Sequence, residues 1–157
     1  WLRGDGKGGL VSVPGQVSGL AVYGEQRGAA VGDFNEDGRV DLVVTQNGAA
    51  TRLFENVAAR PGLRVRLKGP PGNPSGIGAV LRLEFASGPG PARELHAGSG
   101  YWSQDSLVHV LACPEPPSKL RVAWPGGPTT HYDVQPEALE VVADVEGGLK
   151  ILKRRVK

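Results

Sequence analysis

Several residue types that define other protein classes are scarce in this chain of 157 residues. It has no methionine and one cysteine, Cys113, and aromatic residues make up 6% of it. A single cysteine excludes an internal disulfide and a CxxC metal site, and we expect this one to lie in the core. No apolar run approaches the roughly 18 residues of a membrane-spanning helix, so we expect no membrane span. The sequence opens on Trp1 and shows no signal peptide, which is typical of a fragment of a longer protein.

Glycine and proline are instead abundant, with 24 and 13 residues. The glycines follow no three-residue period, which excludes collagen. A glycine costs about 1 kcal/mol in a helix interior and a proline about 3 kcal/mol, so long helices are disfavoured. Apolar and polar residues alternate in residues 63–68, 81–85 and 120–124, and Leu139 and Val141 continue this pattern. Such alternation, interrupted by turn residues, predicts an all-β protein of many short strands.

The basic charge is concentrated at one end of the chain. The formal net charge is +2, and residues 150–157 contain five lysines and arginines and no acidic residue. Subtracting those five charges from +2 leaves −3 for residues 1–149. We interpret residues 150–157 as a solvated basic tail. Binding of a polyanion by this tail is an alternative, and nucleic acid is not an expected partner.

The most specific motif is the acidic segment 33–41, which reads DFNEDGRVD. Oxygen-bearing side chains occupy loop positions 1, 3, 5 and 9, and a glycine at position 6 permits a sharp turn. Ca²⁺ takes about six to eight oxygen ligands, which suits this spacing. An EF-hand is excluded because its position 12 requires Glu and Val44 stands there. A turn without metal and a Mg²⁺ site are the weaker alternatives. The predicted calcium ligands are the side chains of Asp33, Asn35, Asp37 and Asp41 and the backbone carbonyl of Arg39.

This segment resembles a known repeat. The stretch GAAVGDFNEDGRVDLVV at 28–44 is similar to the FG-GAP/VCBS repeat, the blade unit of integrin-α-type β-propellers, and the resemblance covers residues 20–56. It implies a β-hairpin whose loop binds Ca²⁺. Residues 4–10 look like the closing hairpin of a preceding blade. A propeller needs at least about four blades, so we expect the remaining blades upstream.

A second resemblance covers residues 73–127. The stretches NPSGIGA at 73–79, ELHAGSGYWSQ at 94–104 and LRVAWPGG at 120–127 occur in the order found in the ASPIC/UnbV domain. The departure from that family lies at residues 107–117. The resemblance implies an all-β domain without established chemistry.

The stretch 97–106 within this second region is a polar, glycine-rich loop with two aromatic residues. We interpret it as a loop that its two rings pin over the core. The alternative is a surface that contacts sugar or peptide. The candidate ligand-binding residues are Tyr101, Trp102, Ser103 and Gln104.

Catalytic motifs are not evident. The histidines His96, His109 and His131 are scattered, and neither a G-x-S-x-G elbow nor a phosphate-binding loop occurs. We therefore expect no enzyme activity. The tripeptide RGD at 3–5 fits the blade hairpin better than an adhesive motif.

Together these features predict an all-β fold with a partial β-propeller blade followed by a small β-sandwich or barrel-like domain. The predicted boundaries are 1–60 for the blade remnant with its calcium hairpin, 61–149 for the ASPIC/UnbV-like domain and 150–157 for the basic tail. We expect a non-catalytic calcium-binding interaction module with a protein or glycan partner. A weak Ca²⁺ site, with a dissociation constant of about 10⁻⁴–10⁻³ M, suits an extracellular or exported protein. The alternative is an accessory carbohydrate-binding part of a secreted enzyme.

Overall fold

The computed structural model describes residues 1–155, and these form an all-β protein with several separate sheets. The described chain contains one short helix, the single turn α1 (Gly15–Ser18). The predicted fold class is therefore confirmed at the level of all-β. Within residues 1–155, no helix has the length and apolar character needed to cross a membrane.

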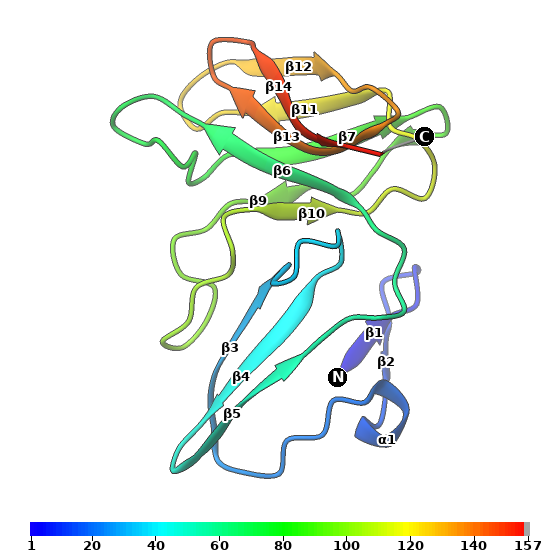
Figure 1. Ribbon diagram of the computed structural model, residues 1–157, viewed down its shortest axis with the longest axis vertical. Coiled ribbons are helices and arrows are strands. Elements are labelled where there is room, and N and C mark those ends of the chain that lie inside the picture. The colour runs from blue at the N-terminus through cyan, green and yellow to red at the C-terminus, as the bar shows by residue number, and fades with distance from the viewer. Residues whose placement is uncertain (156–157) are drawn as a thin grey trace.

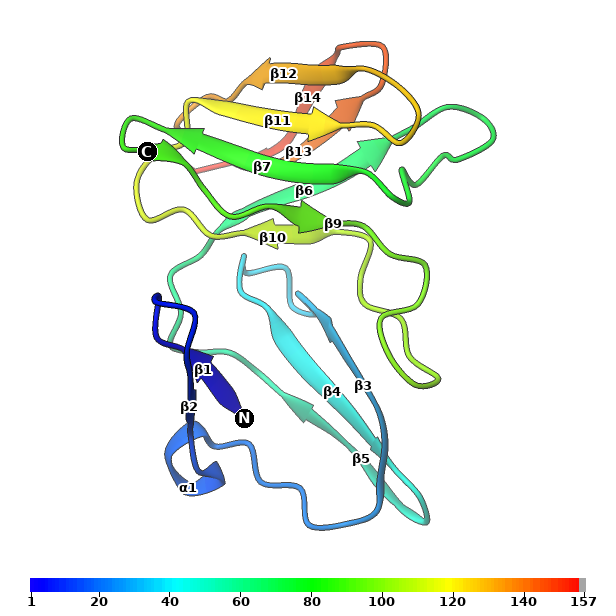
Figure 2. The ribbon, with the colours of Figure 1, turned by 180° about the vertical axis from the view of Figure 1, so that it is seen from behind.

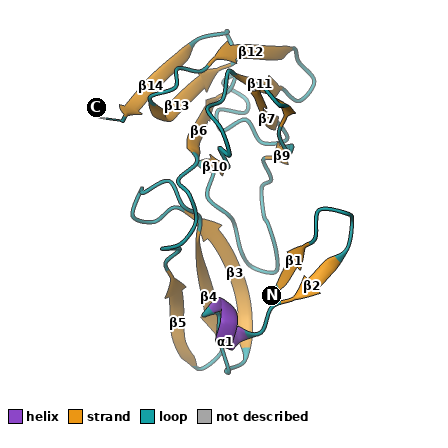
Figure 3. Ribbon diagram, turned by 90° about the vertical axis from the view of Figure 1, so that its right-hand side faces the viewer, coloured by secondary structure: helices purple, strands orange, loops and turns teal. Residues whose placement is uncertain are grey.

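The C-terminal part consists of two sheets packed as layers (Figures 1 and 3). One sheet has the strand order β10-β6-β13-β14, and the other has the order β12-β11-β7-β8 with β9 beside β7. The first contains β6 (Leu63–Lys68), β10 (His109–Leu111), β13 (Ala138–Asp144) and β14 (Leu149–Arg154). The second contains β7 (Val80–Phe85), β8 (Gly88–Pro89), β9 (Arg93–Glu94), β11 (Lys119–Ala123) and β12 (Thr129–Asp133). Neither sheet closes on itself, so the described residues do not form the barrel that was one of the two predicted architectures.

One of the two inner strands of the first sheet is β6, which pairs antiparallel with β10 and parallel with β13. In the parallel register Val141 lies opposite Val65, and Glu140 lies opposite Arg64. One face of β6 therefore points toward the second sheet and the other toward the N-terminal part of the chain.

The hydrophobic core fills the space between these two sheets. The predicted alternation is confirmed for the strands at 81–85 and 120–124, because their apolar residues are the ones that are buried. In 63–68 Leu63 and Val65 are buried as predicted, but Arg64 between them is buried as well and Leu67 is half-buried. Burial of each large side chain contributes about 1.5–3 kcal/mol. The fully buried members include Val65, Leu81, Leu120, Val122 and Val141.

On β13 the predicted alternation fails at one position. Leu139 and Val141 were expected on the same buried face. The pairing with β14 shifts register between Ala138 and Val141, as in a β-bulge, so that Ala138 packs against the core while Leu139 stays outside the core cluster. An extra residue in one strand reverses the facing of every residue before it.

The N-terminal part forms two further sheets, β1-β2 and β3-β4-β5 (Figure 2). Their strands are β1 (Leu2–Gly4), β2 (Leu10–Ser12), β3 (Gln26–Gly32), β4 (Asp41–Gln46) and β5 (Ala49–Phe54). Val44 is the sole buried apolar residue among residues 1–62, whereas eleven of the fifteen exposed large hydrophobic side chains lie there. This part therefore has almost no core of its own.

The predicted basic tail requires a correction. Residues 150–154 belong to β14, where Ile151 pairs with Val141 and packs against the core. Arg154 forms an ion pair with Glu137 at 2.9 Å. The C-terminal domain therefore continues past residue 149 through Arg154, because the apolar residues at 149 and 151 alternate with the basic ones. Residues 156 and 157 lie outside the described residues.

Truncation of Leu81 to alanine should lower the free energy of unfolding by about 3 kcal/mol, because the side chain is fully buried between the two sheets. Leu152 on β14 is 44% exposed, and its truncation should cost about 0.5 kcal/mol or less. Urea denaturation of both variants measures the difference. Equal losses in the two variants would contradict the assigned core.

Candidate functional site

The acidic segment connects β3 to β4, and we call this strand–loop–strand unit, residues 26–46, the acidic hairpin. Gly38 has a φ of 84°, a left-handed conformation that suits the glycine expected at the sharp turn. The carboxylate of Asp33 accepts hydrogen bonds from the backbone amides of Asp37 at 3.0 Å and Gly38 at 2.8 Å. Asp41 accepts from the amides of Phe34 at 2.9 Å and Asn56 at 2.8 Å. The two terminal carboxylates of the motif thus close the loop.

The middle of the loop is held by Asn35, Asp37 and Arg39. The Asn35 side-chain oxygen accepts from the Asp37 amide at 3.1 Å. Asp37 accepts from the Arg39 amide at 2.9 Å and from the Arg39 guanidinium at 2.8 Å. Partial desolvation alone would raise the pKa of Asp37, but the hydrogen bonds from Arg39 outweigh it and lower that pKa.

The donor chemistry of the loop fits Ca²⁺, since all five predicted ligands supply oxygen and the turn glycine is in place. The side-chain oxygens of Asp33, Asn35, Asp37 and Asp41 accept hydrogen bonds from the chain, and arginine side chains supply the compensating positive charge to Asp33 and Asp37. Across residues 1–155, no three His, Cys, Asp or Glu side chains are grouped in a way that would hold a metal ion.

A buried ion-pair network joins the acidic hairpin to the C-terminal sheets. Arg64 on β6 contacts Asp33 with one guanidinium nitrogen and Glu140 with another, the second at 3.0 Å. The side chains of Arg64, Asp33 and Glu140 are 4%, 1% and 2% exposed. Arg66 donates to the other Glu140 oxygen at 2.6 Å. Burial alone would raise the pKa of Glu140, but the hydrogen bonds from Arg66 and Arg64 prevail and hold it below its ordinary value.

Further contacts reinforce this joint at the turn of the loop. The amide of Gly62 donates to the carbonyl of Gly38 at 2.8 Å, so the segment leading into β6 pairs with the loop backbone. Glu36 pairs with Lys153 on β14 and lies 3.5 Å from Arg64. The hydrogen bond from Lys153 lowers the pKa of Glu36. Lys153, which the sequence analysis placed in a solvated tail, therefore helps to hold the hairpin.

The predicted aromatic loop lies between β9 and β10 and descends along β3 (Figure 2). The amide of Ser106 donates to the carbonyl of Val31 at 2.8 Å, and the amide of Val31 donates to the carboxylate of Asp105 at 2.8 Å. A Cβ added at Gly28 would lie 3.2 Å from the carbonyl oxygen of Tyr101. The loop backbone is thus packed directly on the acidic hairpin.

The two aromatic rings of this loop face solvent. Tyr101 is 64% exposed and Trp102 is 90% exposed, and their ring centroids lie 6.0 Å apart. The interpretation that these rings pin the loop over the core is therefore wrong. Trp102 has a φ of 52°, an uncommon conformation for a bulky residue. We call Tyr101 and Trp102 together the aromatic surface.

The other two candidates support the loop from within. The Gln104 side chain accepts from the Gly98 amide and donates to the carbonyls of His96 and Asp105, each at 3.0 Å. The carbonyl of Ser103 accepts from the Ser99 amide at 3.1 Å. The four candidates therefore have two roles: the rings of Tyr101 and Trp102 face solvent, whereas Ser103 and Gln104 hold the loop in shape through hydrogen bonds.

Cys113 packs against the core, as expected. Burial raises the pKa of its thiol, which reduces the thiolate available as a nucleophile at neutral pH. Burial also lowers the pKa of His109.

Sequence reasoning missed Arg64 and Glu140. Alternation places both on the face of their strands opposite the core, which normally means a solvent-exposed face. The signal available in the sequence was the acidic loop itself, whose three aspartates require nearby positive charge.

Comparison with known proteins identifies the C-terminal region. Residues 69–142 match the family model described as ASPIC and UnbV, from the turn before β7 to within β13. This confirms the resemblance for an ASPIC/UnbV domain, and the match extends beyond the expected residues 73–127 on both sides. The acidic hairpin lies outside the match, so the FG-GAP/VCBS resemblance stays a prediction. No curated protein matches the chain.

Replacement of Glu140 by glutamine should make stability less dependent on acid pH. The folded-state pKa of Glu140 is lowered, so the wild type gains stability from this group above its ordinary pKa of 4.5 and loses it as pH falls through the folded value. The stability difference between wild type and Glu140→Gln should therefore be largest at neutral pH and shrink in acid. Urea titrations from pH 7 to about pH 3 measure it. Glu146→Gln, at an exposed position, is the control. A pH-independent difference would contradict the predicted linkage.

Proposed function

We propose that this chain is a non-catalytic, extracellular calcium-binding interaction module, in which the acidic hairpin supports an aromatic surface that binds a protein or glycan. The observation that carries the proposal is the position of the Tyr101–Trp102 backbone on Gly28 of the hairpin, with both rings exposed. Rigid aromatic residues supply large contact area with few rotatable bonds, which favours them at binding surfaces.

The backbone of Trp102 supports a binding role. A non-glycine residue in the left-handed region costs about 1–2 kcal/mol, and such strain clusters at functional sites. Because the Trp102 ring is 90% exposed, its packing contacts offset little of this conformational cost. A loop selected for stability alone would place glycine or asparagine at this position.

In the proposed module Ca²⁺ is held by the side chains of Asp33, Asn35, Asp37 and Asp41 and the carbonyl of Arg39. The ion would supply positive charge to the clustered carboxylates and so order the loop beneath the aromatic surface. Ca²⁺ would compete with the Arg64 guanidinium for the carboxylate of Asp33, which makes a weak site reasonable.

We further propose that β3, β4 and β5 form an FG-GAP/VCBS-type blade of a β-propeller whose remaining blades precede this chain. Three antiparallel strands in the order β3-β4-β5 and a calcium-type loop between the first two support this. The exposed side chains of Val31, Leu53 and Val57 would then face neighbouring blades.

A second candidate is an accessory carbohydrate-binding part of a secreted enzyme. The two rings of the aromatic surface are tilted by 41° at a centroid distance of 6.0 Å, which offers adjacent faces to a chain of sugar rings. Binding to glycans in particular would favour this candidate over a protein partner.

Addition of about 1 mM Ca²⁺ should raise the melting temperature of the wild type relative to a chelator by roughly 3–6 °C, if the dissociation constant is about 10⁻⁴ M. Asp37→Ala should abolish the shift because it removes a central ligand. Asp133→Ala, at an exposed position on β12, should retain it. Differential scanning calorimetry measures all three. Identical melting of the wild type with Ca²⁺ and with chelator would refute the calcium site.

Replacement of Trp102 by glycine should leave the melting temperature equal or higher, because glycine accepts a φ of 52° and the lost ring is exposed. The same variant should lose binding on a glycan array or in pull-down of a protein partner. Tyr23→Ala, which removes another ring that is 90% exposed, is the matched control. Retention of binding by Trp102→Gly would exclude the aromatic surface as the contact.

A further inference from the structure

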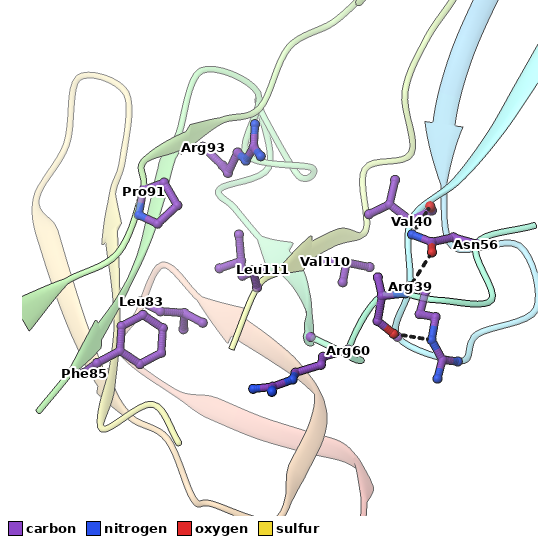
Figure 4. A pocket seen from close by; sticks show the side chains of 14 residues that line it. Arg39, Val40, Asn56, Arg60, Leu83, Phe85, Pro91, Arg93, Val110 and Leu111 are labelled. Carbon is purple, nitrogen blue, oxygen red and sulfur yellow. Dashed lines mark hydrogen bonds between the residues drawn. The ribbon is translucent and has the colours of Figure 1, made fainter. Parts of the chain in front are cut away.

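A hollow that is separate from the aromatic surface lies between the acidic hairpin and the C-terminal sheets (Figure 4). Its volume is about 200 Å³, and neither Tyr101 nor Trp102 lines it. Leu83, Phe85 and Leu111 form an apolar wall on the domain side. Val40 of the acidic hairpin lies across from this wall in Figure 4.

This hollow continues into a second one, of about 570 Å³, at the β7–β8 turn. The two share Arg60, Phe85 and Pro91, and the second is also lined by Pro89 and Pro114. We call the two hollows together the groove. Its continuity suits an extended ligand, and its proline walls are stiff because each proline has a fixed φ.

The charge of the groove is one-sided. Arg39 is paired with Asp37, but the side chains of Arg60 and Arg93 make no ion pair or hydrogen bond with any residue in 1–155. No acidic residue of the described chain lines either hollow. In Figure 4, Arg60 extends toward Phe85, and Arg93 lies at the opposite end of the apolar wall.

We propose that the groove binds the C-terminal end of an extended apolar peptide, with the terminal carboxylate paired to Arg60. A guanidinium can hold a carboxylate through two parallel hydrogen bonds, and no residue in 1–155 occupies that of Arg60. The remaining peptide side chains lie against the apolar and proline walls. A single charge at one end matches a groove that is apolar apart from its arginines. Arg93 adds long-range attraction for the same charge.

The probe is the N-acetylated tripeptide Val-Leu-Phe with a free carboxylate, compared with the same peptide as its C-terminal amide. Isothermal titration of the full 157-residue chain should show about tenfold or more weaker binding of the amide. Arg60→Gln should reduce binding of the acid to the level of the amide, and Arg93→Gln should reduce it less. Arg52→Gln, at an exposed arginine on β5 that does not line the groove, should change nothing.

Cys113 lines the second hollow and provides an independent reporter because it is the single cysteine. Bound acid peptide should slow alkylation of Cys113 by iodoacetamide in the wild type and not in Arg60→Gln. Circular dichroism confirms that each variant is folded.

Any one of four results would overturn the proposal: no binding of the acid, equal affinity for acid and amide, equal loss of affinity in Arg52→Gln, or an unchanged alkylation rate at saturating peptide. Arg39 of the acidic hairpin lines the first hollow, so the titrations are run in chelator; they then involve neither Ca²⁺ nor Trp102, and the groove is tested separately from the proposed function.

Discussion

The arrangement of this protein depends on the Arg64 guanidinium, which is buried between two carboxylates that belong to different parts of the chain. Asp33 comes from the acidic hairpin and Glu140 from β13, and neither is exposed enough for water to stabilise its charge. Removing one member of a buried ion pair leaves the other uncompensated, at a cost of about 3–5 kcal/mol. The ion pairs of Arg64 therefore contribute little net stability but constrain the arrangement. The buried charges compensate one another only when the acidic hairpin is docked on the β6 sheet.

This constraint positions the two surfaces that we assign to binding. With the hairpin held against β6 and β14, the edge of β3 faces the 97–106 loop and supports the backbone of Trp102. The same docking encloses the groove between Val40 and the apolar wall of the C-terminal sheets. The aromatic surface is backed by the hairpin, and the groove is lined by residues of both parts. A strained aromatic loop requires a rigid support, which the acidic hairpin supplies. The N-terminal sheets have almost no core, so their own rigidity depends on contacts with the C-terminal domain.

Much of the fold was predictable, because period-two alternation reports directly on which strand face is buried. The core positions Leu81, Leu83, Leu120 and Val122 follow from it. Prediction failed where local pattern and tertiary pairing diverged. The bulge in β13 reversed the facing of Ala138 and Leu139, and no residue type there signals it. The basic residues of β14 were mistaken for a tail because their charge masked the alternation of Leu149 and Ile151.

The all-β class, the ASPIC/UnbV domain and the order of oxygen donors in the acidic loop can be predicted from the residues alone, since these features depend on neighbours within a few residues or on motifs. The packing of the elements against one another, in contrast, buries Arg64, leaves Tyr101 and Trp102 facing solvent, and places Arg60 and Arg93 along an apolar groove. Each of these outcomes depends on which surface of one element covers another. A side chain on the outer face of a strand has the same local pattern whether water or a second sheet lies above it, and its charge or ring has a different role in each case.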